Sequence, residues 1–192
     1  ELGAPFLTAG LWLRPQCYPR SGESPAEAVR REAATVRNAC GIVDVSTLGK
    51  IEVQGPDAAA FLDRLYCNRV GNLAIGRARY GAMLREDGMV FDDGTISRLA
   101  EDWFYLTTTT ANASKVLQHV ELYAQVGWPE LRVAVTSVTE QWAVVALAGP
   151  KARRVLERVG EGLDLADAAL PHMSVVEARV AGLPARIFRV SF

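Results

Sequence analysis

The stretch from Tyr80 to Thr110 limits the possible folds most, because it holds several strands joined by tight turns. Segments 79–84 and 89–99 flank Arg85-Glu86-Asp87-Gly88, where the glycine suits the left-handed position of a hairpin turn. A further predicted strand ends in four consecutive threonines, Thr107 to Thr110. The stretch therefore predicts an antiparallel β-hairpin followed by a hydroxyl-rich strand end.

Size and charge exclude several classes of function. A chain of 192 residues, 49% of them hydrophobic, can bury about 70% of its unfolded surface. Lys and Arg total 21 against 22 Asp and Glu, which leaves no basic stripe for a nucleic-acid backbone. No apolar run approaches the roughly 20 residues needed to span a bilayer, and the first residues lack the pattern of a signal peptide. We expect a cytoplasmic protein with no nucleic-acid or membrane partner.

Cysteine usage predicts neither a disulfide framework nor a metal site. Cys17, Cys40 and Cys67 are an odd set without CxxC spacing, and His119 and His172 are distant from them in sequence. The chain begins at a glutamate and stops inside a predicted strand. We therefore expect it to be part of a longer polypeptide, to which its function belongs.

The first half of the chain reads as mixed helix and strand. Ser24-Pro25-Ala26-Glu27 is a capping box with proline at the first helical position, and it predicts a helix that ends near Gly41. The predicted buried face of this helix is Val29, Ala33, Val36 and Cys40. Further predicted elements are strands at 42–45 and 50–53, a helix opened by Gly55-Pro56-Asp57 with Phe61, Leu62 and Leu65 inward, and a loop at 68–76.

The second half predicts a β-α-β-β-α-β order, which is typical of a ferredoxin-like unit. The predicted elements are strand 103–110, helix 112–126, strands 131–137 and 141–148, helix 150–159, and a hairpin around Ala181-Gly182. The fold class is α+β, with antiparallel sheets covered by helices. We expect residues 1–100 to form an N-terminal part with the aspartate-bearing hairpin and residues 101–192 to form a ferredoxin-like subdomain.

Asp92 and Asp93 are the candidate catalytic groups. Side chains alternate faces along a strand, so both carboxylates reach one pocket only if the strand bulges there, and at most one is expected to be catalytic. One interpretation is a turn or bulge in which both carboxylates bind nearby amides. The other is that one carboxylate orients or deprotonates an amine, since a charge-assisted bond contributes about 1.5–3 kcal/mol.

The neighbouring polar residues have structural alternatives too. The threonines suit a strand, and the last hydroxyl is placed to cap a helix at Asn112. Tyr80 fits either a core aromatic with a solvated hydroxyl or a ring that stacks on a ligand. Gly55-Pro56 and Gly149-Pro150 lack the spacing of a phosphate-binding loop.

Several motifs resemble the aminomethyltransferase family, whose best-known member is the glycine-cleavage T-protein. They are STLGKI (46–51), RYGAMLREDG (79–88), DDGT (92–95), TTTT (107–110) and TSVTEQWA (136–143). Agreement runs from Leu11 to Phe192 without large gaps. The sequences of these motifs are most similar to those of the branch found in the carboxy-terminal part of heterotetrameric sarcosine oxidase alpha subunits.

The resemblance implies small α+β subdomains around a cavity that holds tetrahydrofolate. Asp93 would contact the folate nitrogens that accept a one-carbon unit, with Asp92 supporting it. Leu48 and Tyr80 would border the pterin. In the oxidase branch the one-carbon unit comes from an imine made by flavin-dependent sarcosine oxidation, giving 5,10-methylenetetrahydrofolate. Flavins and NAD are then expected elsewhere in the complex, and the beta, gamma and delta subunits are the expected partners.

Two departures from the family pattern qualify these implications. Thr109 stands where the T-proteins place an asparagine, and a hydroxyl offers one donor where an amide offers two. The family's TGExGxE-like segment, which follows the position of Phe192, is absent, so we expect a C-terminally incomplete fold that is inactive alone. The alternatives are a free-standing T-protein, a dimethylglycine oxidase-like enzyme, and a non-catalytic folate-binding scaffold.

Overall fold

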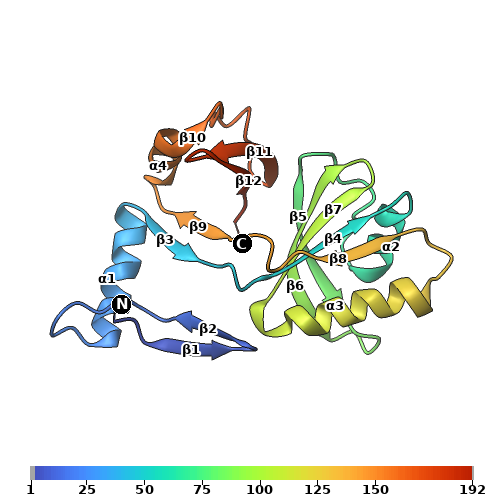
Figure 1. Ribbon diagram of the computed structural model, residues 1–192, viewed down its shortest axis with the longest axis horizontal. Coiled ribbons are helices and arrows are strands. Elements are labelled where there is room, and N and C mark those ends of the chain that lie inside the picture. Colours follow the sequence, from blue (N-terminus) through green and yellow to red (C-terminus); the bar gives the residue numbers. More distant parts are fainter. Residues whose placement is uncertain (1–2, 192) are drawn as a thin grey trace.

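The computed structural model describes residues 3–191 as an elongated α+β molecule with three parts (Figure 1). The largest sheet and two helices form one end, and α1 with the first hairpin forms the other. In residues 3–191 the helices are α1 (Pro25–Asn38), α2 (Ala58–Leu65), α3 (Ala113–Leu122) and α4 (Ala152–Val159). The strands are β1 (Phe6–Ala9), β2 (Trp12–Pro15), β3 (Gly41–Asp44), β4 (Gly49–Gln54), β5 (Ala78–Leu84), β6 (Val90–Ala100), β7 (Trp103–Thr108), β8 (Ala134–Ser137), β9 (Val145–Ala148), β10 (Gly160–Glu161), β11 (Ser174–Val180) and β12 (Leu183–Arg189).

The five-stranded sheet has the order β5-β6-β7-β4-β8, and every neighbouring pair in it is antiparallel. β4 and β6 are consequently parallel with β7 between them, and they are linked through α2. β7 and β8 are likewise parallel with β4 between them, and they are linked through α3. These two split β-α-β units interlock, which is the ferredoxin-like arrangement.

The main core lies on one face of this sheet, beneath α2 and α3. Every second residue of each strand points to this face and packs against residues of the two helices, as expected for a sheet with one covered face. The fully buried members include Ile51, Val53, Phe61, Leu62, Ile96, Phe104, Leu106, Val116 and Val120.

The opposite face of the sheet carries polar and aromatic side chains, and we call it the polar face. By strand alternation and register, its members are Lys50, Glu52, Tyr80, Asp93, Thr95, Ser97, Tyr105 and Thr107. β12 covers part of this face, because the Phe188 ring stacks on the Tyr105 ring with centroids 5.5 Å apart. Arg186 also reaches across, and its Nη1 donates to Glu52 Oε1 at 2.8 Å.

The predicted ferredoxin-like unit is present, but in a different part of the chain. It comprises β4, α2, β6, β7, α3 and β8, so it spans residues 49–137 and not 101–192. The prediction was wrong because it paired strands within the second half, whereas β7 and β8 both pair with β4. β9 pairs instead with β3, and β10, β11 and β12 form a separate sheet.

Most other predicted elements are confirmed, with shifted ends. The hairpins of β5 with β6 and of β11 with β12 are present, with Gly88 and Gly182 at positive φ. The strand predicted at 103–110 ends at Thr108, and the helix predicted to reach 126 changes to a π-helical turn at Tyr123. The hairpin of β1 and β2 was not predicted.

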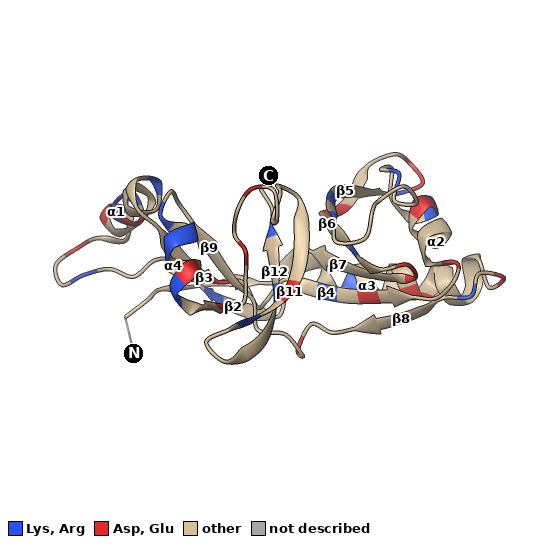
Figure 2. Cartoon of the chain, turned by 90° about the horizontal axis from the view of Figure 1, so that it is seen from above, with Lys and Arg blue, Asp and Glu red and all other residues tan. Residues whose placement is uncertain are grey.

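The capping box at Ser24 is confirmed, but the predicted buried face of α1 is wrong. Glu27 N donates to Ser24 Oγ, and Ser24 N donates to Glu27 Oε2. The buried residue of the helix is Ala28, whereas Val29 and Ala33 are exposed. Both acidic and basic residues occur on α1 and on α4 (Figure 2).

Candidate functional site

A register shift in the β5–β6 hairpin sets the directions of the two aspartates. The shift falls between Met83 and Leu84. On the Met83 side of the shift the pairing is regular, with Met83 opposite Asp92 and Ala82 opposite Asp93. Because this part of the ladder is regular, the two carboxylates project from opposite faces of the sheet. Asp92 therefore faces the helices, and Asp93 lies on the polar face.

Asp92 is buried, and both its carboxylate oxygens accept hydrogen bonds. Oδ2 accepts from Thr109 N at 3.1 Å, while Oδ1 accepts from Thr109 Oγ1 at 2.6 Å and from Asn112 Nδ2 at 3.2 Å. The carboxylate thus fixes the turn that leads into α3. Its position away from the polar face leaves it no oxygen for a ligand there.

Asp93 is half-buried, and one oxygen of its carboxylate is engaged. Tyr80 Oη donates to Asp93 Oδ2 at 2.6 Å, and this bond is the main cause that raises the pKa of Tyr80. Tyr80 is 42% exposed and Asp93 is half-buried, so both residues are partly accessible to solvent. Among residues 3–191, the hydrogen bond from Tyr80 is the one that the Asp93 carboxylate accepts. Oδ1 is therefore available to a donor from a ligand.

The hydroxyl groups of the four threonines form hydrogen bonds with other groups of the chain and do not line an open edge of the sheet. Thr107 Oγ1 lies 2.8 Å from Thr95 Oγ1, and Thr108 Oγ1 donates to the Thr109 carbonyl at 3.1 Å. Thr110 Oγ1 lies 3.1 Å from Thr47 Oγ1. The predicted hydroxyl cap at Asn112 is absent, since no side chain caps the short 3₁₀ turn or α3 in this described segment.

The predicted site residues of the described chain form separate hydrogen-bonded groups and not one network. Thr47, beside Leu48, bonds to Thr110, and Thr109 bonds to Asp92. Asp93 follows in β6 and bonds to Tyr80. Tyr80 and Asp93 are thus paired on the polar face, whereas Thr109 turns its hydroxyl to Asp92 and away from that face.

One residue of this region was missed by sequence reasoning. Lys50 is fully buried, and its Nζ donates to the Ser46 carbonyl at 2.6 Å. Burial lowers its pKa, while the charge of Asp44 acts in the opposite direction. The signal was the alternation of Lys50, Ile51, Glu52 and Val53, which puts two charged residues on the sheet face opposite two apolar ones.

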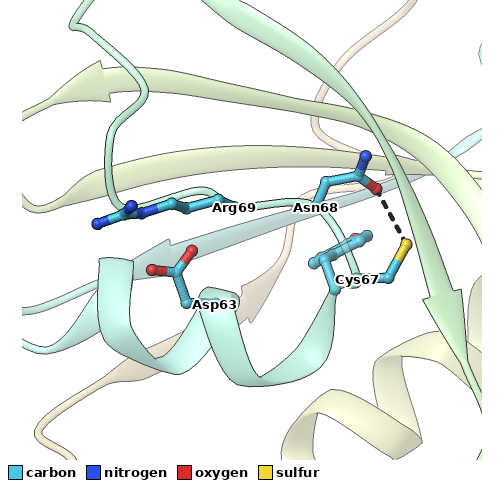
Figure 3. Close-up of a pocket in the computed structure, with 5 residues that line it drawn as sticks. Asp63, Cys67, Asn68 and Arg69 are labelled. Atoms are coloured by element: carbon cyan, nitrogen blue, oxygen red, sulfur yellow. Dashed lines mark hydrogen bonds between the residues drawn. The ribbon is translucent and has the colours of Figure 1, made fainter.

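Two pockets in the described residues lie elsewhere. One, of about 290 Å³, is lined by Asp63, Tyr66, Cys67, Asn68 and Arg69 (Figure 3). Its polar groups already hold the loop after α2, because Asp63 Oδ1 accepts from Gly71 N at 2.9 Å and Asn68 Oδ1 accepts from Ala82 N at 2.9 Å. The other, of about 480 Å³, lies between the hairpin turn at 85–87 and the end of α3. Neither is lined by Asp93, Tyr80 or Thr109.

Comparison with solved structures defines the fold class as aminomethyltransferase-like. The whole chain superposes on 47% of the glycine cleavage system aminomethyltransferase T from Bartonella henselae, with a TM-score of 0.81 and 28% identity. It also shares its fold with a chain of the heterotetrameric sarcosine oxidase from Corynebacterium sp. U-96 (TM-score 0.56, 18% identity, 88% of this chain and 82% of that one).

The chain belongs to the family described as the GCVT N-terminal domain, whose model matches residues 1–192. It is 51% identical to the sarcosine oxidase subunit alpha of Rhizobium meliloti, over 99% of this chain and 20% of that subunit. It is 36% identical to the aminomethyltransferase of Thermus thermophilus, over 100% of this chain and 51% of that enzyme. The chain thus spans about a fifth of the former protein and about half of the latter.

Within residues 3–191, no helix has both the length and the apolar character needed to cross a membrane.

Proposed function

We propose that this domain is the tetrahydrofolate-binding part of a sarcosine oxidase alpha subunit. In this proposal the folate takes the one-carbon unit of an imine that a flavin elsewhere in the complex makes from sarcosine. The CH₂ group passes from the imine nitrogen to the two folate nitrogens, whose two hydrogens end on the nitrogen of the released glycine. The products are 5,10-methylenetetrahydrofolate and glycine.

The observation that carries the proposal is the Tyr80–Asp93 pair on the polar face. Tyr80 binds one carboxylate oxygen, which fixes the direction of the other. That free oxygen can accept a hydrogen bond from a folate N–H and withdraw its proton as the one-carbon unit arrives. The family membership and the 51% identity to a sarcosine oxidase alpha subunit give this pair its proposed substrate.

The other residues with a proposed role at the site are Leu48, Asp92 and Thr109. Leu48 is half-buried and offers an apolar side chain to the pterin, and the exposed ring of Tyr80 offers a second surface. Asp92 and Thr109 act indirectly, since their mutual bonds fix the strand end beside Asp93. We propose Asp93 as the catalytic residue and Asp92 as its positioning residue.

The test is Asp93→Asn, with Asp102→Asn as a matched control at an exposed turn. We expect Asp93→Asn to weaken 5-formyltetrahydrofolate binding by the assembled oxidase about ten- to a hundredfold, as for one lost charge-assisted bond. In the assembled oxidase we expect the same variant to divert product from methylenetetrahydrofolate to formaldehyde. Unchanged affinity and unchanged product ratio would exclude the proposed role of Asp93.

A second candidate is the aminomethyl transfer of the glycine cleavage system, favoured by the TM-score of 0.81 to an aminomethyltransferase. It places the same folate on the same carboxylate but takes the carbon from an aminomethyl donor and releases ammonia. An ammonia assay with that donor separates the two. If folate binds but neither donor reacts faster than in solution, the domain is a non-catalytic folate scaffold.

A further inference from the structure

Lys50 is a buried charge that the proposed chemistry does not use. It lies in β4 opposite Thr107, in a polar row that continues through Thr95 to Tyr80 across four strands. Its exposed fraction is 0%, although the other two lysines of the chain, Lys115 and Lys151, are exposed. Burying an ammonium group is costly unless it is paired, so its contacts indicate what it holds in place.

The contact of Lys50 is the turn between β3 and β4, residues 45–48. Its ammonium donates to the Ser46 carbonyl at 2.6 Å. The same turn is fixed from other sides, since Ser46 N donates to Asp44 Oδ1 at 2.8 Å and Val144 N donates to Ser46 Oγ at 2.9 Å. Leu48 N closes the turn by donating to the Val45 carbonyl at 3.0 Å.

The turn forms one side of the proposed folate site. Leu48 is its last residue, and Thr47 bonds to Thr110 beside the Asp92 network. Among the hydrogen bonds given above for this turn, the Lys50 bond comes from a strand residue of the polar face, and its ammonium charge complements that of the Asp44 carboxylate, which accepts from Ser46 N. Removing it takes from the Ser46 carbonyl its bond to the Lys50 ammonium.

We propose that Lys50 is a positioning residue that holds the turn at 45–48, so that Leu48 stays in place against the ligand. The proposal rests on the proposed folate site and adds a residue to it. Lys50 touches neither the ligand nor the reacting atoms, so its removal changes affinity through the turn and leaves the Tyr80–Asp93 pair intact.

The test compares Lys50→Met, which keeps the length of the side chain and removes its donor, with Lys115→Met on the exposed surface of α3. Amide hydrogen exchange at Leu48 reports the turn, titration of the assembled oxidase with 5-formyltetrahydrofolate reports the site, and urea unfolding of the chain reports global stability. For Lys50→Met we expect Leu48 exchange and the dissociation constant each to rise about tenfold. We expect urea unfolding to change less than Leu48 exchange, because removing the cost of the buried ammonium offsets part of the bond lost by the Ser46 carbonyl.

The possible outcomes separate this inference from the proposed function. Unchanged Leu48 exchange in Lys50→Met, or faster exchange with unchanged affinity, would overturn the role of Lys50. If the assembled oxidase with the unmodified domain binds no folate, the proposed function fails, while the exchange result still decides whether Lys50 holds the turn. If Lys50→Met does not fold, the Nζ protons of the unmodified chain decide. We expect them to exchange with water more slowly than those of Lys115, and equal rates would refute the bond to Ser46.

Discussion

Asp92 and Asp93 are adjacent in the chain but occupy different environments. Asp92 is 5% exposed and accepts three hydrogen bonds, whereas Asp93 is half-buried on the polar face and accepts one from Tyr80. Strand alternation predicts that they point apart. It does not predict which one faces the helices, because that depends on the register shift at Met83 and Leu84, and hence on the partner strand.

The stability of the domain is expected to depend on Asp92 much more than on Asp93. In Asp92→Asn an amide NH₂ replaces one acceptor oxygen and faces donors of Thr109 or Asn112, so we expect a loss of about 1.5–3 kcal/mol in the free energy of unfolding. Asp93→Asn keeps an acceptor for Tyr80, and we expect a change within about 0.5 kcal/mol. Urea unfolding of both variants measures the difference. Equal losses would contradict the assigned environments.

At the scale of elements, local sequence signals predicted the type and order of the helices and strands far better than they predicted which strands pair. The capping box located the start of α1, and Gly88 located the turn of the β5–β6 hairpin. The partners of β7, β8 and β9 were not predictable in this way, because β4 lies between β7 and β8 and β3 pairs with β9. Such pairings depend on contacts between segments about 50 to 100 residues apart.

The capping box is expected to control fraying of the first turn of α1. Ser24→Ala removes the acceptor of Glu27 N, and such caps contribute about 1 kcal/mol, so we expect amide exchange of Glu27 to rise about fivefold. Ser21→Ala, at an exposed position before the cap, is the control. Bonds from Ser24 lower the pKa of Glu27, so its contribution is present above about pH 4.3 and is lost as pH falls through the lowered pKa. If the ratio of the Glu27 exchange rate in Ser24→Ala to that in the unmodified chain does not change with pH, a role for the Glu27 charge is contradicted.

At the scale of the whole molecule, one buried ion pair connects the five-stranded sheet to the C-terminal sheet. Arg186 of β12 bonds to Glu52 of β4, with the two side chains 8% and 11% exposed. The guanidinium carbon also lies over three rings, at 4.9 Å from Trp103, 5.5 Å from Tyr105 and 4.6 Å from Trp142. Because the three rings come from β7 and from the segment before β9, this cluster adds a side-chain link to the backbone bridge between Arg77 and Ser174.

Breaking this pair from one side is therefore expected to separate the two sheets. Glu52→Gln leaves the Arg186 charge buried without its main partner, and we expect a loss of about 3–5 kcal/mol in the free energy of unfolding. Glu177→Gln is the control, because Glu177 lies 3.6 Å from Arg186 Nε but is largely exposed, and we expect a loss below about 1 kcal/mol. Near-ultraviolet circular dichroism, to which Trp103 and Trp142 contribute, reports the separation of the two sheets.

A double-mutant cycle distinguishes the ion pair from general packing. The variant that combines Glu52→Leu with Arg186→Met removes both charges together, so its loss should be smaller than the sum of the two single losses by more than about 1 kcal/mol. Losses that simply add would mean that the guanidinium is held by its three rings and that the carboxylate contributes little. The two sheets would then be joined by aromatic contacts, and the polar face beneath β12 would tolerate a neutral residue at position 52.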